Sequence, residues 1–233
     1  MNKIVSFFLG LVICNFSIAQ QKNDWANFSK YEEANKIAPR GAVVFMGNSI
    51  TEGWVNTSPD FFKNNNYIGR GISGQVSSQM LVRFRRDVID LKPRAVVILS
   101  GTNDIAQNNG FITLENTLGN IISMVELAKA NNIKVILCSV LPAFEFGWRK
   151  ELKPADDVVA LNRLIKKYAD ANKIPYLDYH TAMKDERNGL PEKYAKDGIH
   201  PTPEGYAIME KLVKAEINKL LKIKSKDRQY LFN

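Results

Sequence analysis

Cysteine and histidine are both scarce in this chain of 233 residues, which contains two of each. Cys14 lies in an apolar N-terminal stretch, so Cys138 would be the only thiol left if that stretch were removed, and one thiol cannot form an internal disulfide. Cys138 lies within the apolar run at residues 135–138, which favours a buried free thiol over a catalytic one. Stability must then come from a hydrophobic core, and the length of the chain suits one domain with such a core.

Long hydrophobic runs are absent after residue 19. Residues 1–19 carry Lys3 near the start, then an apolar run, and end in Ser-Ile-Ala, a small-x-small cleavage site. The run is shorter than the roughly 20 apolar residues that span a bilayer. We therefore expect a signal peptide at residues 1–19 and a single domain at residues 20–233. The protein should be exported, periplasmic or extracellular, with no integral membrane association after cleavage.

Acidic residues are the minority among the charges, with 24 Asp and Glu against 32 Lys and Arg and a net charge of +8. Much of the excess lies in residues 211–228, where lysine recurs at helical spacing without interleaved aromatics. This pattern is typical of a solvated helix face and predicts no nucleic-acid partner. Attraction to an acidic polysaccharide or envelope surface is compatible with it.

Strand and helix patterns alternate along the rest of the chain. Short apolar runs predict strands at residues 42–46, 67–68, 95–99, 133–140 and 175–177. Amphipathic periodicity and start signals predict helices at residues 25–37, 75–91, 114–130, 155–171 and 203–222. The alternation indicates an α/β fold in which helices cover both faces of a five-stranded parallel sheet.

Several polar or glycine-rich motifs follow the predicted strands, where parallel sheets bind their ligands. Ser49 follows Gly47, which permits a tight turn that exposes the hydroxyl, although a serine there also caps helices. The α/β-hydrolase elbow Gly-x-Ser-x-Gly is disfavoured because Thr51 takes the last position. Asn103 follows another predicted strand. It is either an ordinary turn residue or a residue whose side-chain amide donates a hydrogen bond to an oxyanion.

Residues 69–74 match the dinucleotide fingerprint Gly-x-Gly-x-x-Gly. That site needs an acidic residue at the end of the next strand, whereas Asp87 and Asp90 lie on the predicted helix. The motif is also interpreted as a turn in which the Gly74 amide, at a helix start, donates to a developing oxyanion. We favour this second interpretation.

Asp197 and His200 are separated by three positions, so one short turn delivers an acid and a base together. A serine, a histidine and an orienting acid are the parts of an acyl-transfer site. His180, with Asp178 two residues before it, is the rival base. We favour His200, because Asp197 is placed to orient its imidazole.

Together, residues 47–50, Gly74, residues 101–104 and residues 197–201 resemble, in order, the four motif blocks of the SGNH, or GDSL-type, hydrolases. The resemblance implies a flavodoxin-like three-layer α/β/α sandwich and a serine esterase without metal or other cofactor. It implies that Ser49 is the nucleophile, His200 the base and Asp197 the orienting acid. The oxyanion donors would be the amides of Ser49 and Gly74 and the side chain of Asn103.

Two departures from the family pattern bear on this site. Asn48 stands where the family usually has aspartate, and residues 73–77 differ from the commoner Gly-Asp-Thr. Because Asn48 is not the triad acid, catalysis should survive.

The substrate is expected to be a small-molecule or glycan ester, most of all an O-acetyl group of a carbohydrate, because no long apolar lid or acyl channel is evident. Phe146 and Trp148, in residues 144–149 after the fourth strand, are candidates to stack on sugar rings, or they pack beneath the loop. The alternatives are a lysophospholipase or thioesterase and, in another class, a non-catalytic glycan-binding protein on the same fold.

Overall fold

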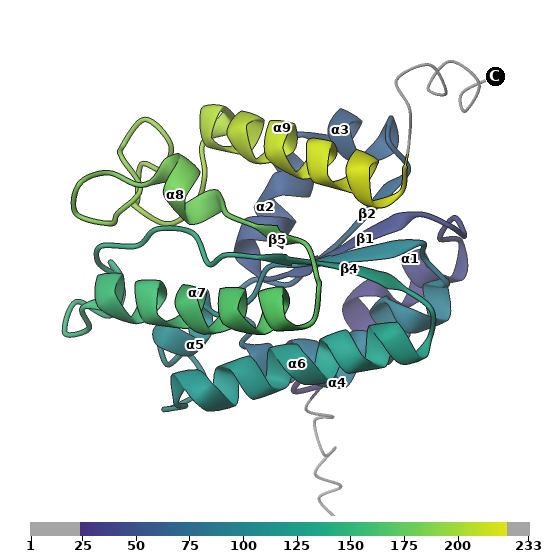
Figure 1. Ribbon diagram of the computed structural model, residues 1–233, viewed down its shortest axis with the longest axis horizontal. Coiled ribbons are helices and arrows are strands. Elements are labelled where there is room, and N and C mark those ends of the chain that lie inside the picture. The colour runs from purple at the N-terminus through teal and green to yellow at the C-terminus, as the bar shows by residue number, and fades with distance from the viewer. Residues whose placement is uncertain (1–23, 223–233) are drawn as a thin grey trace, which may run out of the picture.

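The structure is a computed structural model that describes residues 24–222. The predicted signal peptide at residues 1–19 lies outside the described residues. The centre is a five-stranded sheet in which every paired neighbour is parallel, in the order β2-β1-β3-β4-β5 (Figure 1). Its strands are β1 (Val43–Gly47), β2 (Tyr67–Gly71), β3 (Ala95–Ile98), β4 (Lys134–Cys138) and β5 (Tyr176–Leu177). This is the flavodoxin-like strand order, and it confirms the predicted fold class.

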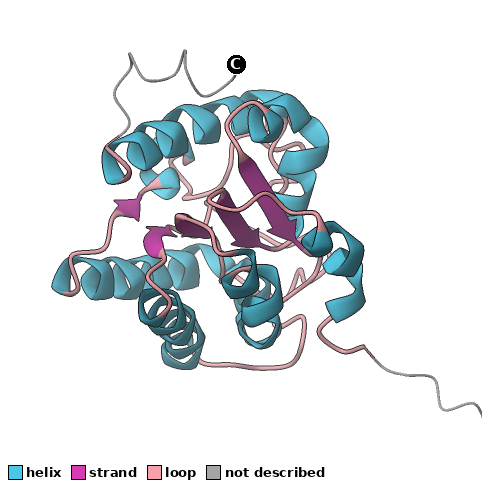
Figure 2. Ribbon diagram, turned by 90° about the vertical axis from the view of Figure 1, so that its right-hand side faces the viewer, coloured by secondary structure: helices cyan, strands magenta, loops and turns pink. Residues whose placement is uncertain are grey.

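Helices cover both faces of the sheet, so the described residues form three layers (Figures 1 and 2). One face packs against α4 (Ser77–Asp87), α6 (Leu114–Ala130) and α7 (Pro154–Ala171). The other packs against α2 (Ser49–Thr57), α3 (Pro59–Lys63), α8 (Tyr179–Met183) and α9 (Pro203–Leu220). The remaining elements are η1 (Phe28–Tyr31), α1 (Glu32–Lys36), η2 (Ile89–Leu91) and α5 (Thr102–Ile105). The two apolar clusters on either side of the sheet form the core.

Strands β1, β2 and β3 end at the same level. Gly47 at the end of β1 is in register with Gly71 at the end of β2, and Met46 is in register with Ile98 at the end of β3. The segments that follow these strands therefore leave the sheet at one edge. This edge includes the β1/β3 switch point, where ligands of flavodoxin-like sheets bind.

Two of the predicted helices are each divided into two shorter helices in the structure. The helix predicted at residues 25–37 is instead η1 followed by α1, and it begins after Asn27, which has a left-handed backbone with φ 54°. The helix predicted at residues 75–91 is α4 followed by η2. The short helices α2, α3, α5 and α8 were not predicted as separate elements.

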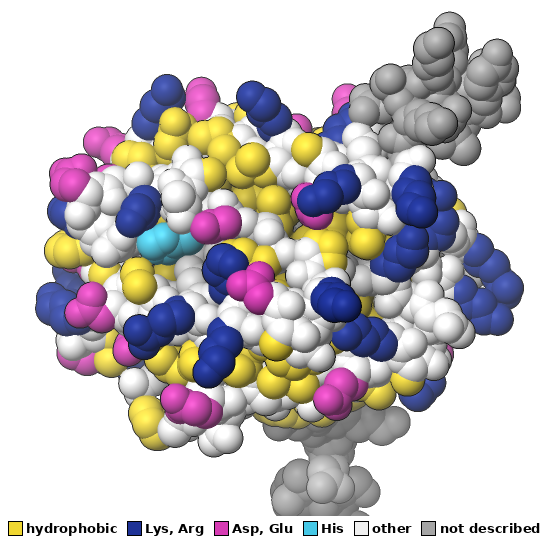
Figure 3. All heavy atoms as spheres, in the orientation of Figure 1, with side chains coloured by type: hydrophobic (Ala, Val, Ile, Leu, Met, Phe, Trp, Pro, Cys, Tyr) yellow, Lys and Arg dark blue, Asp and Glu magenta, His cyan; other side chains and the backbone are white. Residues whose placement is uncertain are grey.

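Among the described residues, no helix is both long and apolar enough to cross a lipid bilayer. Basic and acidic side chains are interspersed over much of the face in Figure 3, and basic ones predominate toward its right-hand side.

Candidate active site

Ser49 is the first residue of α2, two positions after the end of β1. Asn48 caps this helix, because its buried side-chain oxygen accepts a hydrogen bond from the Ile50 amide at 3.0 Å. Amides in the first helical turn have no partner within the helix, and they carry the positive end of its dipole. The Ser49 amide and hydroxyl thus lie where negative charge is stabilised. Asn48 supplies the cap oxygen that an aspartate would supply, but without a charge.

The first two glycines of the Gly-x-Gly-x-x-Gly motif are packing residues against α2. A Cβ atom on Gly71 would lie 2.3 Å from the Glu52 amide nitrogen and 2.6 Å from the Asn48 carbonyl oxygen. A Cβ atom on Gly69 would lie 2.1 Å from a methyl group of Val55. Only glycine lets β2 approach the helix this closely. These two glycines are therefore accounted for by packing, without a nucleotide.

A continuous hydrogen-bond chain joins Ser49, His200 and Asp197. The Ser49 Oγ and His200 Nε2 atoms are 2.9 Å apart, and His200 Nδ1 lies 2.6 Å from Asp197 Oδ2. The other oxygen of Asp197 accepts from the amides of Ile199 at 3.0 Å and His200 at 2.8 Å. Partial burial pushes the pKa of Asp197 upward, but the hydrogen bonds from His200 and from the two amides outweigh it and hold the pKa below its usual range. An ionised Asp197 can orient the imidazole through Nδ1 and leave Nε2 to face the serine.

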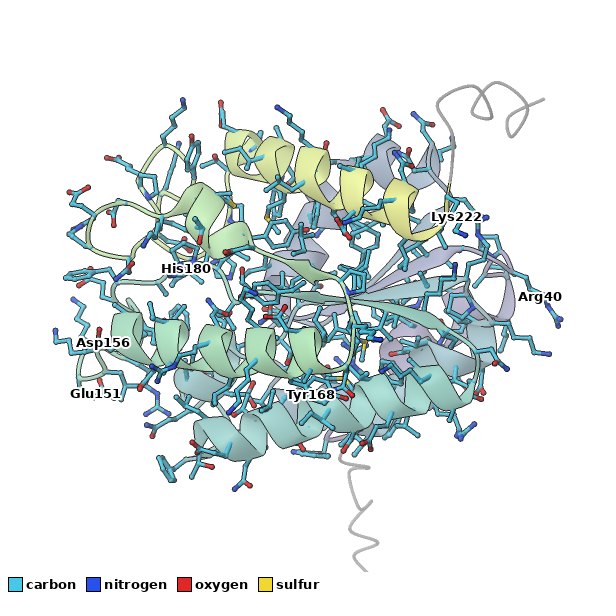
Figure 4. The ribbon with its side chains drawn as sticks, in the orientation of Figure 1. Arg40, Glu151, Asp156, Tyr168, His180 and Lys222 are labelled. Atoms are coloured by element: carbon cyan, nitrogen blue, oxygen red, sulfur yellow. The ribbon has the colours of Figure 1, made fainter. Side chains whose placement is uncertain are left out.

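His180, the rival base, lies on α8 (Figure 4) and its side chain is buried. Burial lowers the pKa of His180, the charge on Lys184 lowers it further, and Asp178 opposes both. The side chain of Asp178 accepts from the amide of Thr181 and so caps α8. Of the two histidines, it is His200 that the structure brings into hydrogen-bond contact with Ser49.

The two other proposed oxyanion donors adjoin each other. Asn103 lies in α5, is only 4% exposed, and its Nδ2 donates to the carbonyl oxygen of Gln75 at 3.0 Å. The neighbouring Gly74 is exposed and has a left-handed backbone with φ +77°, a conformation that favours glycine. The donors predicted from the sequence therefore come from the segments that follow β1, β2 and β3. Their role in binding an oxyanion stays a prediction.

A buried arginine supports this edge of the sheet and was missed by the sequence reasoning. The Arg83 guanidinium is fully buried and donates to the carbonyl oxygens of Gly47 at 3.0 Å and Arg70 at 2.9 Å. It also donates to the side chain of Gln75 at 2.6 Å and pairs with Asp87 at 2.8 Å. The only sequence signal was the Arg83/Asp87 spacing of four on a helix face that also carries Met80 and Phe84. Arg83 thereby ties the ends of β1 and β2 to the segment that bears Gly74.

Asp104 joins α5 to α4. Its buried carboxylate accepts from both the amide and the hydroxyl of Ser77. Burial raises the pKa of Asp104, and the hydrogen bonds from Ser77 oppose the rise. This contact holds Asn103 beside Gln75.

The two aromatic candidates in residues 144–149 have opposite environments. Phe146 is 0% exposed and belongs to the hydrophobic core, so the prediction that it contacts substrate is wrong: its ring has no free face. Trp148 is 46% exposed, and its indole nitrogen donates to the side-chain oxygen of Asn108 at 3.0 Å. A substrate contact of Trp148 stays a prediction. Asn108 was also missed, because nothing in its local sequence marks it.

Two pockets include residues of the proposed site. One, of about 330 Å³, includes Gly74 and Trp25, and its other lining side chains are mostly polar. Another, of about 450 Å³, includes Asp197 and Arg187. Within residues 24–222, no three His, Cys, Asp or Glu side chains are grouped so that they could hold a metal ion.

A flavodoxin-like sheet with a Ser–His–Asp chain at its carboxyl edge is the arrangement expected of an acyl-transferring hydrolase. A sequence model of the GDSL-like lipase/acylhydrolase family matches residues 45–208. The chain therefore belongs to the GDSL-like lipase/acylhydrolase family, a family of ester-hydrolysing enzymes.

Two solved structures share 55% identity with the chain. One is a protein assigned as an acylhydrolase from Bacteroides fragilis; the match covers 86% of this chain and 100% of the other, with a TM-score of 0.84. The second is a GDSL-like lipase from Bacteroides thetaiotaomicron; the match covers 84% and 100%, with a TM-score of 0.82.

Among curated proteins, an uncharacterized lipoprotein, YqeF, from Bacillus subtilis is 29% identical over 127 residues, which are 47% of this chain and 52% of the lipoprotein. The chain spans about half the length of the curated relatives it matches.

Proposed function

We propose that this protein hydrolyses carboxylic esters through an acyl-enzyme formed on Ser49. The observation that carries the proposal is the pair of contacts on His200, 2.9 Å from its Nε2 to Ser49 Oγ and 2.6 Å from its Nδ1 to Asp197. A base within this distance of the hydroxyl, held in turn by an acid, is what activates a serine nucleophile.

The reaction proceeds in two halves. Ser49 Oγ attacks the ester carbonyl carbon while His200 Nε2 takes its proton, and the amides of Ser49 and Gly74 with the Asn103 side chain bind the oxyanion. The carbon–oxygen bond to the leaving alcohol then breaks, and His200 returns the proton to that alcohol. Water attacks the acyl-enzyme with its proton passing to His200, and the acid leaves as Ser49 recovers its proton. Asp197 stabilises the imidazolium in both halves.

Turnover of p-nitrophenyl acetate tests the reaction. Ser49→Ala and His200→Ala should abolish it without changing the thermal unfolding midpoint by more than a few degrees. Ser123→Ala is the matched control, because its hydroxyl bonds only to the Gly119 carbonyl within α6, and it should keep full activity. Full activity in Ser49→Ala would refute the assignment, and an inactive wild-type protein that still binds glycans would support the binding-protein alternative.

For the substrate, we propose a small acyl group, acetyl above all, on a carbohydrate. Of the two pockets that adjoin the site, the one at Gly74 is mainly polar and presents Trp25, 46% exposed. Polar side chains beside an open aromatic ring suit a sugar, which offers hydroxyl groups and apolar ring faces. Trp148 offers a second open aromatic ring in the loop beside Asn108.

The alternative is a lysophospholipase or thioesterase. Such an enzyme would need room for a long acyl chain. The apolar pocket of about 510 Å³ between α1, α2 and β2 has this character, but Ser49, Gly74 and His200 are not among its lining residues. A panel of acetylated oligosaccharides, p-nitrophenyl esters of increasing chain length and lysolipids, with Ser49→Ala as the blank, decides between them. Preference for long acyl chains would overturn the acetyl proposal.

We further propose that the protein is exported, periplasmic or extracellular. The pattern of residues 1–19 supports this, as does similarity to a bacterial lipoprotein. N-terminal sequencing and fractionation of the native protein would test it: a mature chain beginning near residue 20 outside the cytoplasm is expected.

A further inference from the structure

The Asn103 carboxamide is held at both ends. Its oxygen accepts from the side-chain nitrogen of Asn108 at 3.0 Å, and its nitrogen donates to the Gln75 carbonyl oxygen at 3.0 Å. A carboxamide nitrogen has two N–H groups, so one remains for a substrate oxyanion. Turning the group over would bring oxygen against the Gln75 carbonyl and nitrogen against the Asn108 donor, and would leave no N–H for the oxyanion.

Asn108 is itself oriented by a neighbour. Its side-chain oxygen accepts from the indole nitrogen of Trp148 at 3.0 Å. Because an indole nitrogen only donates, Trp148 fixes which end of Asn108 is the oxygen, and hence that Asn108 presents its nitrogen to Asn103. The donors run in one direction from Trp148 through Asn108 and Asn103 to the Gln75 carbonyl.

Hydrogen bonds to the backbone also hold Asn108 beside Asn103 and beside the loop that bears Trp148. The Asn108 amide donates to the carbonyl oxygen of Asn103 at 3.0 Å, and the Arg149 guanidinium donates to the Gln107 carbonyl oxygen at 3.1 Å. The segment after α5 is thus attached both to the oxyanion residue and to the loop that bears Trp148.

We propose that Asn108 is a positioning residue for the reaction: by donating to Asn103 Oδ1, in an orientation set by Trp148, it keeps the free N–H of Asn103 directed at the reacting carbonyl. The inference rests on the proposed role of Asn103 as an oxyanion donor. Asn108 acts through Asn103 and need not touch the reacting atoms.

Asn108→Asp is the sharpest test, because it replaces the donor with an acceptor of the same shape. At neutral pH the introduced carboxylate repels Asn103 Oδ1 and favours the turned carboxamide. With p-nitrophenyl acetate as substrate and the full chain as enzyme, kcat should fall about 10- to 100-fold, less than the roughly 100- to 1000-fold for outright removal of one oxyanion donor. KM should change less than about threefold. Asn108→Ala should cost less, about twofold to fivefold, since Asn108 is exposed and water can replace the donor.

Two further measurements separate positioning from a merely structural role. In an Asn103→Ala background, Asn108→Asp should cause little additional loss of kcat, because the group it misorients is gone. The ratio of Asn108→Asp to wild-type kcat should also rise as the pH falls and the introduced carboxyl gains a proton that it can donate.

The outcomes are distinguishable. If Asn103→Ala loses about 100-fold or more while Asn108→Asp stays within about threefold of wild type, or if Asn108→Asp costs as much with Asn103 absent as with it present, the positioning role is wrong. If Asn103→Ala itself keeps wild-type kcat while Ser49→Ala is inactive, the oxyanion role of Asn103 fails, and the inference fails with it.

Discussion

His200 Nε2 lies 2.9 Å from Ser49 Oγ, although the two residues are 151 positions apart in the chain. Contacts between α2 and α9 fix this distance. The Tyr206 hydroxyl donates to the Ile50 carbonyl oxygen at 2.8 Å, and the Tyr206 ring stacks on Trp54 with ring centroids 5.7 Å apart. The helix that begins at Ser49 is thereby attached to the helix that follows His200, and the pair is held before any substrate arrives.

Asp197→Asn should impair the reaction far more than it impairs folding. An amide in place of the carboxylate can present an N–H toward His200 Nδ1 and favour the wrong tautomer. The expected loss in kcat is up to roughly 10⁴-fold, the size seen when the acid of a serine protease triad is changed this way. Asp178→Asn makes the same change beside His180, where asparagine can still cap α8, and it should keep activity. Equal kcat in the two variants would contradict the role of Asp197.

Gly71→Ala should disturb the turn that presents Ser49. The added Cβ would lie 2.3 Å from the Glu52 amide nitrogen and 2.6 Å from the Asn48 carbonyl oxygen, so backbone must move. We expect a stability loss of about 1–3 kcal/mol together with reduced kcat.

The control for Gly71→Ala is Gly119→Ala, in the interior of α6, where a Cβ atom meets nothing within 4 Å. It should raise stability by about 0.5–1 kcal/mol and leave kcat unchanged. Denaturant unfolding and steady-state kinetics of both variants measure this, and a Gly71→Ala protein as stable and active as wild type would show that the close approach is not needed.

The apolar strands and the long helices were predictable because each leaves a local signal. The run at residues 95–99 became β3, and the helix predicted at residues 114–130 is α6 with the same bounds. Short helices such as α2 and α5 were not predicted, since a single turn or two after a strand has too few residues to show periodicity.

Within the site, sequence singled out Ser49, Asp197 and His200, which the structure brings together. It could not show that Gly71 packs against α2, or that Asn108 contacts Asn103, because both depend on partners that only the fold supplies. It was wrong for Phe146, which enters the core, whereas the ring of Trp148, two positions on, is exposed.

His180 should make stability depend on pH. Burial holds its pKa in the folded protein below the usual value of 6.5, so the folded state binds fewer protons than the unfolded state just below that pH. The contribution of the buried, neutral His180 to the free energy of unfolding is therefore present above about pH 6.5 and is lost as the pH falls through that value. Between about pH 7 and pH 5, the free energy of unfolding should fall less in His180→Gln than in wild type. Parallel pH profiles of the two proteins would contradict the buried, neutral state of His180.

The nucleophilic serine is the central claim, and covalent labelling by a fluorophosphonate tests it most directly. Intact mass and peptide mapping should show one phosphonyl group per chain, on Ser49, in wild type. Labelling should be slowed strongly in His200→Ala but not in His180→Gln, and it should be absent in Ser49→Ala. Labelling of Ser49→Ala at the wild-type rate, or a wild-type adduct on another residue, would contradict the account.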